Sequence, residues 1–155
     1  MQPTRPSSSL LEEAFEQRRS LRSLPHPDQM QGEPWSLCTT KEAAQLLHVD
    51  PACFTVWKYR GLGPQPEPSY FRGSVQTYRI DRLAAWLAHR HGQTYDQDEA
   101  WTQALERLVH KPEGDTRMLV KQWVELLGPT HAAPRGCRWR PGGFEEYVTS
   151  LQPND

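Results

Sequence analysis

The chain has 155 residues, which is enough for one ordinary domain or two very small ones. Its formal net charge is −1, and its 14 prolines, 10 glycines and six tryptophans predict a loop-rich protein with compact, aromatic-rich cores. No apolar run approaches the ~20 residues that a membrane helix needs, and the first residues lack the apolar segment of a secretory signal. We therefore expect a cytoplasmic protein without a membrane partner.

Few residues suit catalysis or metal binding. The cysteines Cys38, Cys53 and Cys137 are widely spaced without a Cys-x-x-Cys pair, so neither a disulfide framework nor a zinc site is indicated. His89 and His91 end a predicted helix, where cationic or polar residues are common. The sequence contains no glycine-rich phosphate loop, nucleophile elbow or zinc-protease motif. We expect a protein that is not an enzyme and that uses no cofactor and no metal.

Residues 1–36 are predicted to hold a helix and then a linker. Ser9 and Glu12 have the spacing of a capping box, and a broken apolar stripe continues to about Leu24. The prolines between residues 25 and 34 predict a linker. The helix either docks on its own domain or binds a partner subunit, and the sequence leaves both alternatives open.

Two helices joined by a tight turn are predicted next. Thr39 and Glu42 form a second capping-box pattern, which starts the first helix. Residues 48–50 predict the turn, because Asp50 can cap a following helix and Pro51 suits the first position of that helix. The pattern therefore predicts a helix–turn–helix.

The second of these helices is expected over residues 51–60. Phe54 and Trp57 are three residues apart, so they share one face and should bury against the first helix. The glycines and prolines between residues 61 and 68 end this helix and prevent another from starting.

A hairpin and a third helix are predicted after this stretch. The aromatic and β-branched residues between Tyr70 and Tyr78 predict two short strands around a turn at Arg72-Gly73-Ser74. Asp81 is expected to open the third helix, whose inner face carries three apolar residues, namely Leu83, Trp86 and Leu87.

An ordered set of short motifs carries a family resemblance. The motifs are Thr40-Lys41-Glu42-Ala43-Ala44, Val49-Asp50-Pro51, the pair Phe54 and Trp57, Arg60-Gly61, and Tyr78-Arg79 followed by Asp81, Leu83 and Trp86-Leu87. In this order, residues 37 to about 90 resemble the excisionase-like, MerR-related winged helix-turn-helix family of phage, plasmid and bacterial regulators. The resemblance implies a mainly helical fold with a small β-hairpin wing.

The resemblance also implies a function. Members of this family are noncatalytic proteins that bind double-stranded DNA, either to control transcription or to direct a recombinase during excision of a mobile element. The implied location is the nucleoid, and the implied protein partners are a recombinase, the transcription machinery or further copies of the chain assembled on DNA. The sequence does not distinguish between these two roles, since both require the same binding to double-stranded DNA.

The resemblance to this family also implies which residues would bind DNA. Helix 51–60 would enter the major groove, the wing would follow the backbone or the minor groove, and the start of the first helix would touch phosphates. The candidates in this module are Thr39, Thr40, Ala52, Cys53, Thr55, Lys58, Tyr59, Arg60, Arg72, Ser74, Gln76 and Arg79.

The local charge of the chain supports DNA binding, whereas one feature of helix 51–60 favours an alternative function. Residues 37–93 hold seven Lys/Arg against four Asp/Glu, whereas residues 94–134 hold four against seven, so a basic segment precedes an acidic one. The apolar start of helix 51–60, with Ala52, Cys53 and Val56, makes few of the hydrogen bonds that discriminate bases. The alternative interpretation is an adaptor, whose degenerate winged helix docks a partner protein through this apolar helix and the acidic second half of the chain.

The remaining residues, 94–155, are predicted to be helical. Apolar stripes predict helices around residues 101–109 and 115–127, a basic loop follows, and a short helix starts near Gly143. Matching positions recur at offsets of 66 falling to 61, which indicates a tandem, diverged second winged helix-turn-helix. The alternative is an unrelated helical hairpin that mediates oligomerisation.

In either case Arg135, Arg138 and Arg140 are candidates for phosphate contact. The expected organisation is thus residues 1–36, 37–93 and 94–155.

Overall fold

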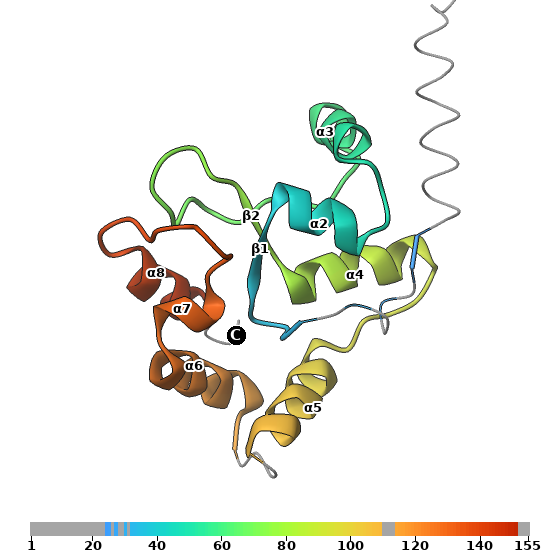
Figure 1. Cartoon of the computed structure of the whole chain (residues 1–155). Coiled ribbons are helices and arrows are strands. Elements are labelled where there is room, and N and C mark those ends of the chain that lie inside the picture. The colour runs from blue at the N-terminus through green and yellow to red at the C-terminus, as the bar shows by residue number, and fades with distance from the viewer. Residues whose placement is uncertain (1–23, 26, 28–29, 31, 110–113, 152–155) are drawn as a thin grey trace, which may run out of the picture.

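The computed structural model describes residues 24–25, 27, 30, 32–109 and 114–151. The helix predicted near the N-terminus lies outside these residues, apart from its last position, Leu24. The described part is mainly helical and contains one two-stranded antiparallel sheet. In chain order its elements are β1 (Leu37–Thr39), α2 (Thr40–Leu46), α3 (Pro51–Arg60), β2 (Thr77–Arg79), α4 (Ile80–Arg90), α5 (Gln97–Val109), α6 (Thr116–Leu127), α7 (Pro129–Ala132) and α8 (Gly143–Ser150) (Figure 1).

Local capping signals fix α2 and α3, and the two predicted helices are present with a short turn between them. The backbone N–H of Glu42 donates to the hydroxyl of Thr39, and the N–H of Thr39 donates to the Glu42 carboxylate. Asp50 accepts a hydrogen bond from the N–H of Ala52 at 2.8 Å, with Pro51 at the first position of α3. Gly61 ends α3 at φ 67°, a conformation that costs glycine little because it has no Cβ.

The hairpin predicted between residues 70 and 78 is wrong. Of this stretch only β2 is a strand, and it pairs with β1, which precedes α2 in the chain (Leu37 opposite Arg79, Thr39 opposite Thr77). The turn at Gly73 and Ser74 is present, but Phe71 forms an isolated antiparallel bridge with Trp139. A strand-like pattern does not specify its partner, and here the aromatic residues of the first half are buried against the C-terminal helices instead.

Asp81 does not cap α4, which is a second correction. The helix begins at Ile80, and Asp81 lies in its first turn with 1% of its surface exposed. Its carboxylate accepts hydrogen bonds from Arg79 Nε at 2.5 Å, from Trp101 Nε1 at 3.1 Å and from the side-chain amide of Gln97. A buried charge needs such partners, so Asp81 joins α4 to α5 rather than closing the end of a helix.

Two hydrophobic clusters divide the interior. The first lies between α2, α3 and α4 and contains the predicted core residues Phe54, Trp57, Leu83 and Leu87. The second cluster combines buried residues of the C-terminal helices with buried residues from the N-terminal half. Its members are Trp35, Leu37, Tyr70, Phe71, Trp101, Ala104, Leu105, Val120, Val124, Ala132, Tyr147, Val148 and Leu151. Because four of these come from residues 35–71, the C-terminal helices share their core with the N-terminal half of the chain.

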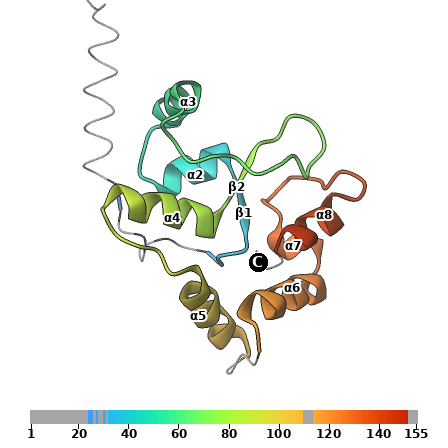
Figure 2. The same ribbon diagram turned by 180° about the vertical axis from the view of Figure 1, so that it is seen from behind.

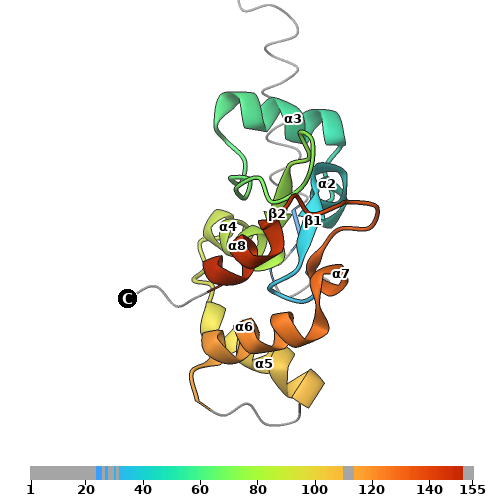
Figure 3. The ribbon, with the colours of Figure 1, turned by 90° about the vertical axis from the view of Figure 1, so that its left-hand side faces the viewer.

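The C-terminal half contains the predicted helices but not the predicted duplicate wing. α5, α6 and α8 agree with the expected segments, and Asp115 caps α6 by accepting from the N–H groups of Arg117 and Met118. Within residues 114–151 no two segments pair as strands, because Trp139 bridges Phe71 in the other half. α5 and α6 lie at the end of the molecule far from α3 (Figures 1 and 3). None of the helices in the described residues has the length and hydropathy of a transmembrane segment.

Candidate nucleic-acid interface

α3 buries one face and exposes the other. Phe54 and Trp57 are each 2% exposed and pack into the first cluster, where Phe54 meets Tyr78 edge-on at 5.3 Å between ring centroids. Cys53 is 7% exposed and belongs to the same buried face. This expected DNA-binding residue therefore points inward, because it lies four residues before Trp57 and so shares the same face of the helix.

The exposed face of α3 carries a row of side chains along the helix, with one basic residue on either side of the row. Ala52, Thr55 and Tyr59 are exposed and spaced three and four residues apart, so they form one row along the helix. Tyr59 is 85% exposed. Lys58 and Arg60 are also exposed and lie on either side of this row. The ten residues of α3 include no Asp or Glu, so its outer surface is positive.

Lys58 ties α3 to the following loop. Its ammonium group donates to the Oε1 atom of Gln76 at 2.6 Å, so two predicted site residues 18 positions apart are brought into contact. The hydroxyl of Thr55 donates to the backbone oxygen of Pro51 within the helix. At the start of α2, the hydroxyl of Thr39 is occupied by the capping box and Thr40 is half-buried.

Glu67 anchors the loop of residues 61–76, and sequence reasoning missed it. Its side chain is buried and accepts a hydrogen bond from Arg82 Nη1 at 2.8 Å, while its backbone N–H donates to Thr77 O at 2.8 Å. Burial raises the pKa of Glu67, and the charges of Arg82 and Arg79 oppose that rise. The signal available in the sequence was a single acid between two prolines in residues 61–71, which hold no other charged residue.

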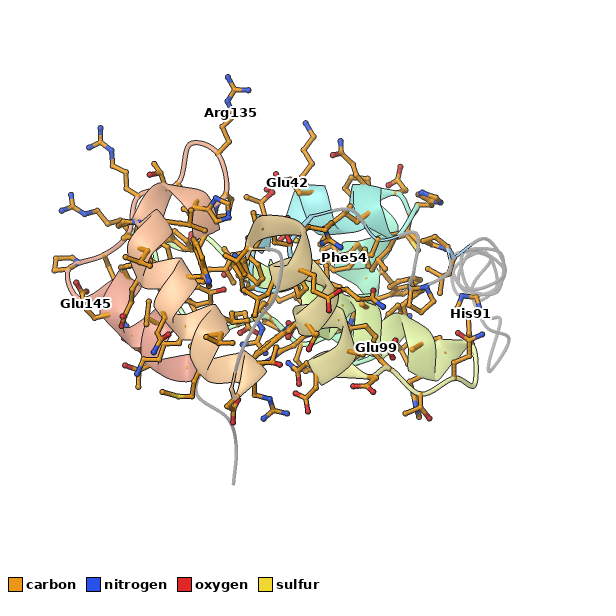
Figure 4. The ribbon with its side chains drawn as sticks, turned by 90° about the horizontal axis from the view of Figure 1, so that it is seen from below. Glu42, Phe54, His91, Glu99, Arg135 and Glu145 are labelled. Carbon is orange, nitrogen blue, oxygen red and sulfur yellow. The ribbon has the colours of Figure 1, made fainter. Side chains whose placement is uncertain are left out.

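Two loops far apart in the sequence lie side by side. Arg72 N donates to Arg138 O at 2.9 Å, and Arg140 N donates to Tyr70 O at 2.9 Å, on either side of the Phe71–Trp139 bridge. The loop before β2 and the loop before α8 are adjacent in opposite views of the molecule (Figures 1 and 2). Arg72, Ser74, Arg135 and Arg138 are exposed there, and the side chain of Arg135 extends away from the ribbon (Figure 4).

Two of the predicted arginines serve the fold. Arg140 donates to the backbone oxygen of Ser69 at 2.7 Å and pairs with Glu146. Arg79 is 4% exposed, pairs with Asp81 and lies over the ring of Trp101 at 5.6 Å. The expectation that Arg79 supports the wing at the surface is therefore corrected, because strand β2 turns its side chain into the junction between α4 and α5.

The exposed candidates thus gather on α3 and the two adjoining loops. Cys53 and Arg79 lie inside, Thr39 and Arg140 have structural partners, and the rest remain at or near the surface. Comparison of the chain with known protein families, with curated proteins and with solved structures found no match.

Proposed function

We propose that the protein binds double-stranded DNA as a small noncatalytic regulator, with α2 and α3 acting as the helix-turn-helix of a winged domain. The observation that carries the proposal is the outer face of α3, an acid-free helix whose exposed row is flanked by Lys58 and Arg60. α3 is anchored from behind by two buried aromatic side chains, so its outer face is held in one orientation.

The row of exposed side chains on α3 and the two basic residues beside it suggest how this helix would bind a DNA duplex. A major groove is wide enough for one helix, and its walls are the two phosphate backbones. If the row of Ala52, Thr55 and Tyr59 faces the base edges, Lys58 and Arg60 face opposite walls of the groove. Lys58 is already held toward the loop of residues 61–76 by Gln76. Cations in these places release condensed counterions, which supplies much of the binding free energy.

The row itself predicts modest base selectivity. A methyl group, a hydroxyl and a phenol can contact thymine methyl groups and sugars, but they form no bidentate pair with guanine or adenine. Selectivity would then depend on the shape and deformability of the DNA, or on several copies bound in sequence. Such a protein suits transcription control and the direction of a recombinase equally, and a nucleoid location follows from either role.

Removing the two flanking charges tests the proposal. We expect the full chain to bind a mixed-sequence duplex with an affinity that falls steeply as salt is raised from ~50 to ~200 mM. Replacing Lys58 and Arg60 together with Gln should lower the slope of log K against log salt by about 1.8, because each phosphate contact contributes ~0.9. Fluorescence anisotropy of a labelled duplex measures both quantities.

The matched control removes the same charge elsewhere. Arg107→Gln with Lys121→Gln deletes two cations from α5 and α6, far from α3 (Figure 3). This variant should bind as the unaltered chain does. Absence of duplex binding at low salt would reject the proposal and favour the adaptor reading, for which the exposure of Tyr59 (85%) and Leu62 (39%) is the specific observation.

A further inference from the structure

The two adjoining loops form a short antiparallel ladder with a definite register. Residue 70 lies opposite 140, 71 opposite 139 and 72 opposite 138. Backbone hydrogen bonds join residues 70 and 140 and residues 72 and 138, whereas Phe71 and Trp139 between them form no hydrogen bond to each other. Hydrogen-bonded and non-hydrogen-bonded pairs alternate in this way in an antiparallel sheet. Arg72 and Arg138 therefore lie directly opposite each other, although 66 residues separate them in the chain.

The middle pair holds this ladder against the C-terminal core. The rings of Phe71 and Trp139 are 4.4 Å apart at their centroids, and Phe71 is 1% exposed. Trp139 also contacts Phe144 at 5.2 Å and Tyr147 at 5.7 Å, both of which belong to α8. The next pair, Arg72 and Arg138, lies beyond these buried aromatic residues, and both side chains are exposed.

This exposed pair is electrostatically unfavourable in the free protein. Like charges directly opposite each other on an antiparallel pair repel and destabilise it. Within residues 32–109 and 114–151 neither Arg72 nor Arg138 has a side-chain hydrogen bond or an ion pair. Glu146, an acid of the adjacent helix, is held by Arg140 instead. Two cations are thus kept side by side without compensation from the described chain.

We propose that these residues form a composite wing, defined as residues 69–72 and 138–140, which binds neighbouring phosphates of one DNA strand through Arg72 and Arg138. The inference rests on the proposed function and deepens it, because it assigns the C-terminal half a direct contact with the duplex. The composite wing is connected to α3 through residues 73–76, where Gln76 accepts from Lys58. Arg135, exposed on the same C-terminal loop, extends the positive surface (Figure 4).

Charge removal from the composite wing tests the inference. Arg72→Gln and Arg138→Gln should each lower the salt slope of duplex binding by about 0.9, and the double variant should lower it by about 1.8. The loss should be equal on two duplexes of unrelated sequence, since phosphate contacts carry no base preference. Arg72→Lys and Arg138→Lys keep the charge and should keep the slope. Arg107→Gln on α5 is the matched control and should change nothing.

Thermal unfolding distinguishes loss of contact from loss of structure. Because each Gln variant removes one member of a repelling pair, its Tm should equal or exceed that of the unaltered chain, while its affinity for the duplex falls. Unchanged slopes in the Gln variants, together with weakened binding in the variant of Lys58 and Arg60, would overturn the composite wing and leave the proposed function standing. A full chain that binds no duplex at low salt would overturn the proposed function itself.

Discussion

Buried ionisable residues connect the loop of residues 61–76 to the helices beneath it. Glu67 pairs with Arg82 of α4, and Arg79 pairs with Asp81, which also accepts from Trp101 of α5. One oxygen of Glu67 and the Nη1 atom of Arg79 are buried without a partner in the described residues. Such incomplete pairing costs free energy, so this junction is a place where a conservative substitution can gain stability.

Glu67→Gln should stabilise the protein at neutral pH. Burial raises the pKa of Glu67 above its ordinary value of 4.5, so the folded state binds more protons than the unfolded chain between the two pKa values. The free energy of unfolding of the unaltered chain therefore falls as pH rises through that interval. Gln does not titrate, so its advantage should be present at pH 7 and should disappear as pH falls to about 4.5.

Thermal unfolding of both proteins across this pH range measures the effect. Glu106→Gln, which makes the same substitution at an exposed position of α5, is the control. A Glu67→Gln variant that is less stable than the unaltered chain at pH 7 would show that the ion pair with Arg82 outweighs the desolvation of the carboxylate.

At the scale of elements, α3 depends on its two ends. Its start is fixed by the Asp50 carboxylate, which satisfies one of the N–H groups that no helix can pair internally. Its end is fixed by Gly61, whose N–H donates to the backbone oxygen of Lys58. Between these ends, Phe54 and Trp57 hold the helix against α2 and α4. The outer face of α3 is therefore oriented by packing, while its length is set by the caps.

Asp50→Ala should lower the free energy of unfolding by about 1 kcal/mol, since it leaves the N–H of Ala52 without its side-chain acceptor. Asp50→Ser keeps an acceptor at the same position and should recover most of this loss. Urea denaturation of the three proteins provides the comparison. Equal destabilisation by Ala and Ser would mean that the charge of Asp50, rather than its capping hydrogen bond, stabilises the start of α3.

At the scale of the whole molecule, the two halves of the chain complete each other. The C-terminal cluster includes Trp35, Tyr70 and Phe71, each at most 1% exposed. The Asp81 carboxylate takes two of its three hydrogen bonds from α5. Removing the C-terminal helices would expose these aromatic side chains and would leave the buried ion pair of Arg79 and Asp81 with fewer partners, which is strongly unfavourable.

A fragment of residues 24–93 should therefore fail to fold cooperatively, although it contains both α2 and α3. A fragment of residues 24–151 should show a single cooperative transition, because it keeps both clusters. Circular dichroism during thermal unfolding compares the two. A cooperative transition in the shorter fragment at the same Tm would show that residues 37–93 are an independent domain.

Features that depend only on near neighbours in the chain follow from the sequence alone. Capping by Thr39, Asp50 and Asp115, the proline at position 51 and the glycine at position 61 act within one helical turn, so their helices were correctly predicted. The burial of Phe54 and Trp57 followed from helical spacing, which is equally local.

The pairing of segments and the burial of charged side chains depend on contacts between distant parts of the chain. β2 pairs with β1 rather than with residues 70–71, Phe71 pairs with Trp139, and Arg79 turns inward to Asp81 and Trp101. The two strand pairings join residues about 40 and 68 positions apart, and the burial of Arg79 depends on Trp101, 22 positions further along the chain. All three are settled by the competition of the segments for the two clusters. Periodicity cannot express that competition, because a strand pattern states which face is apolar but not what covers it.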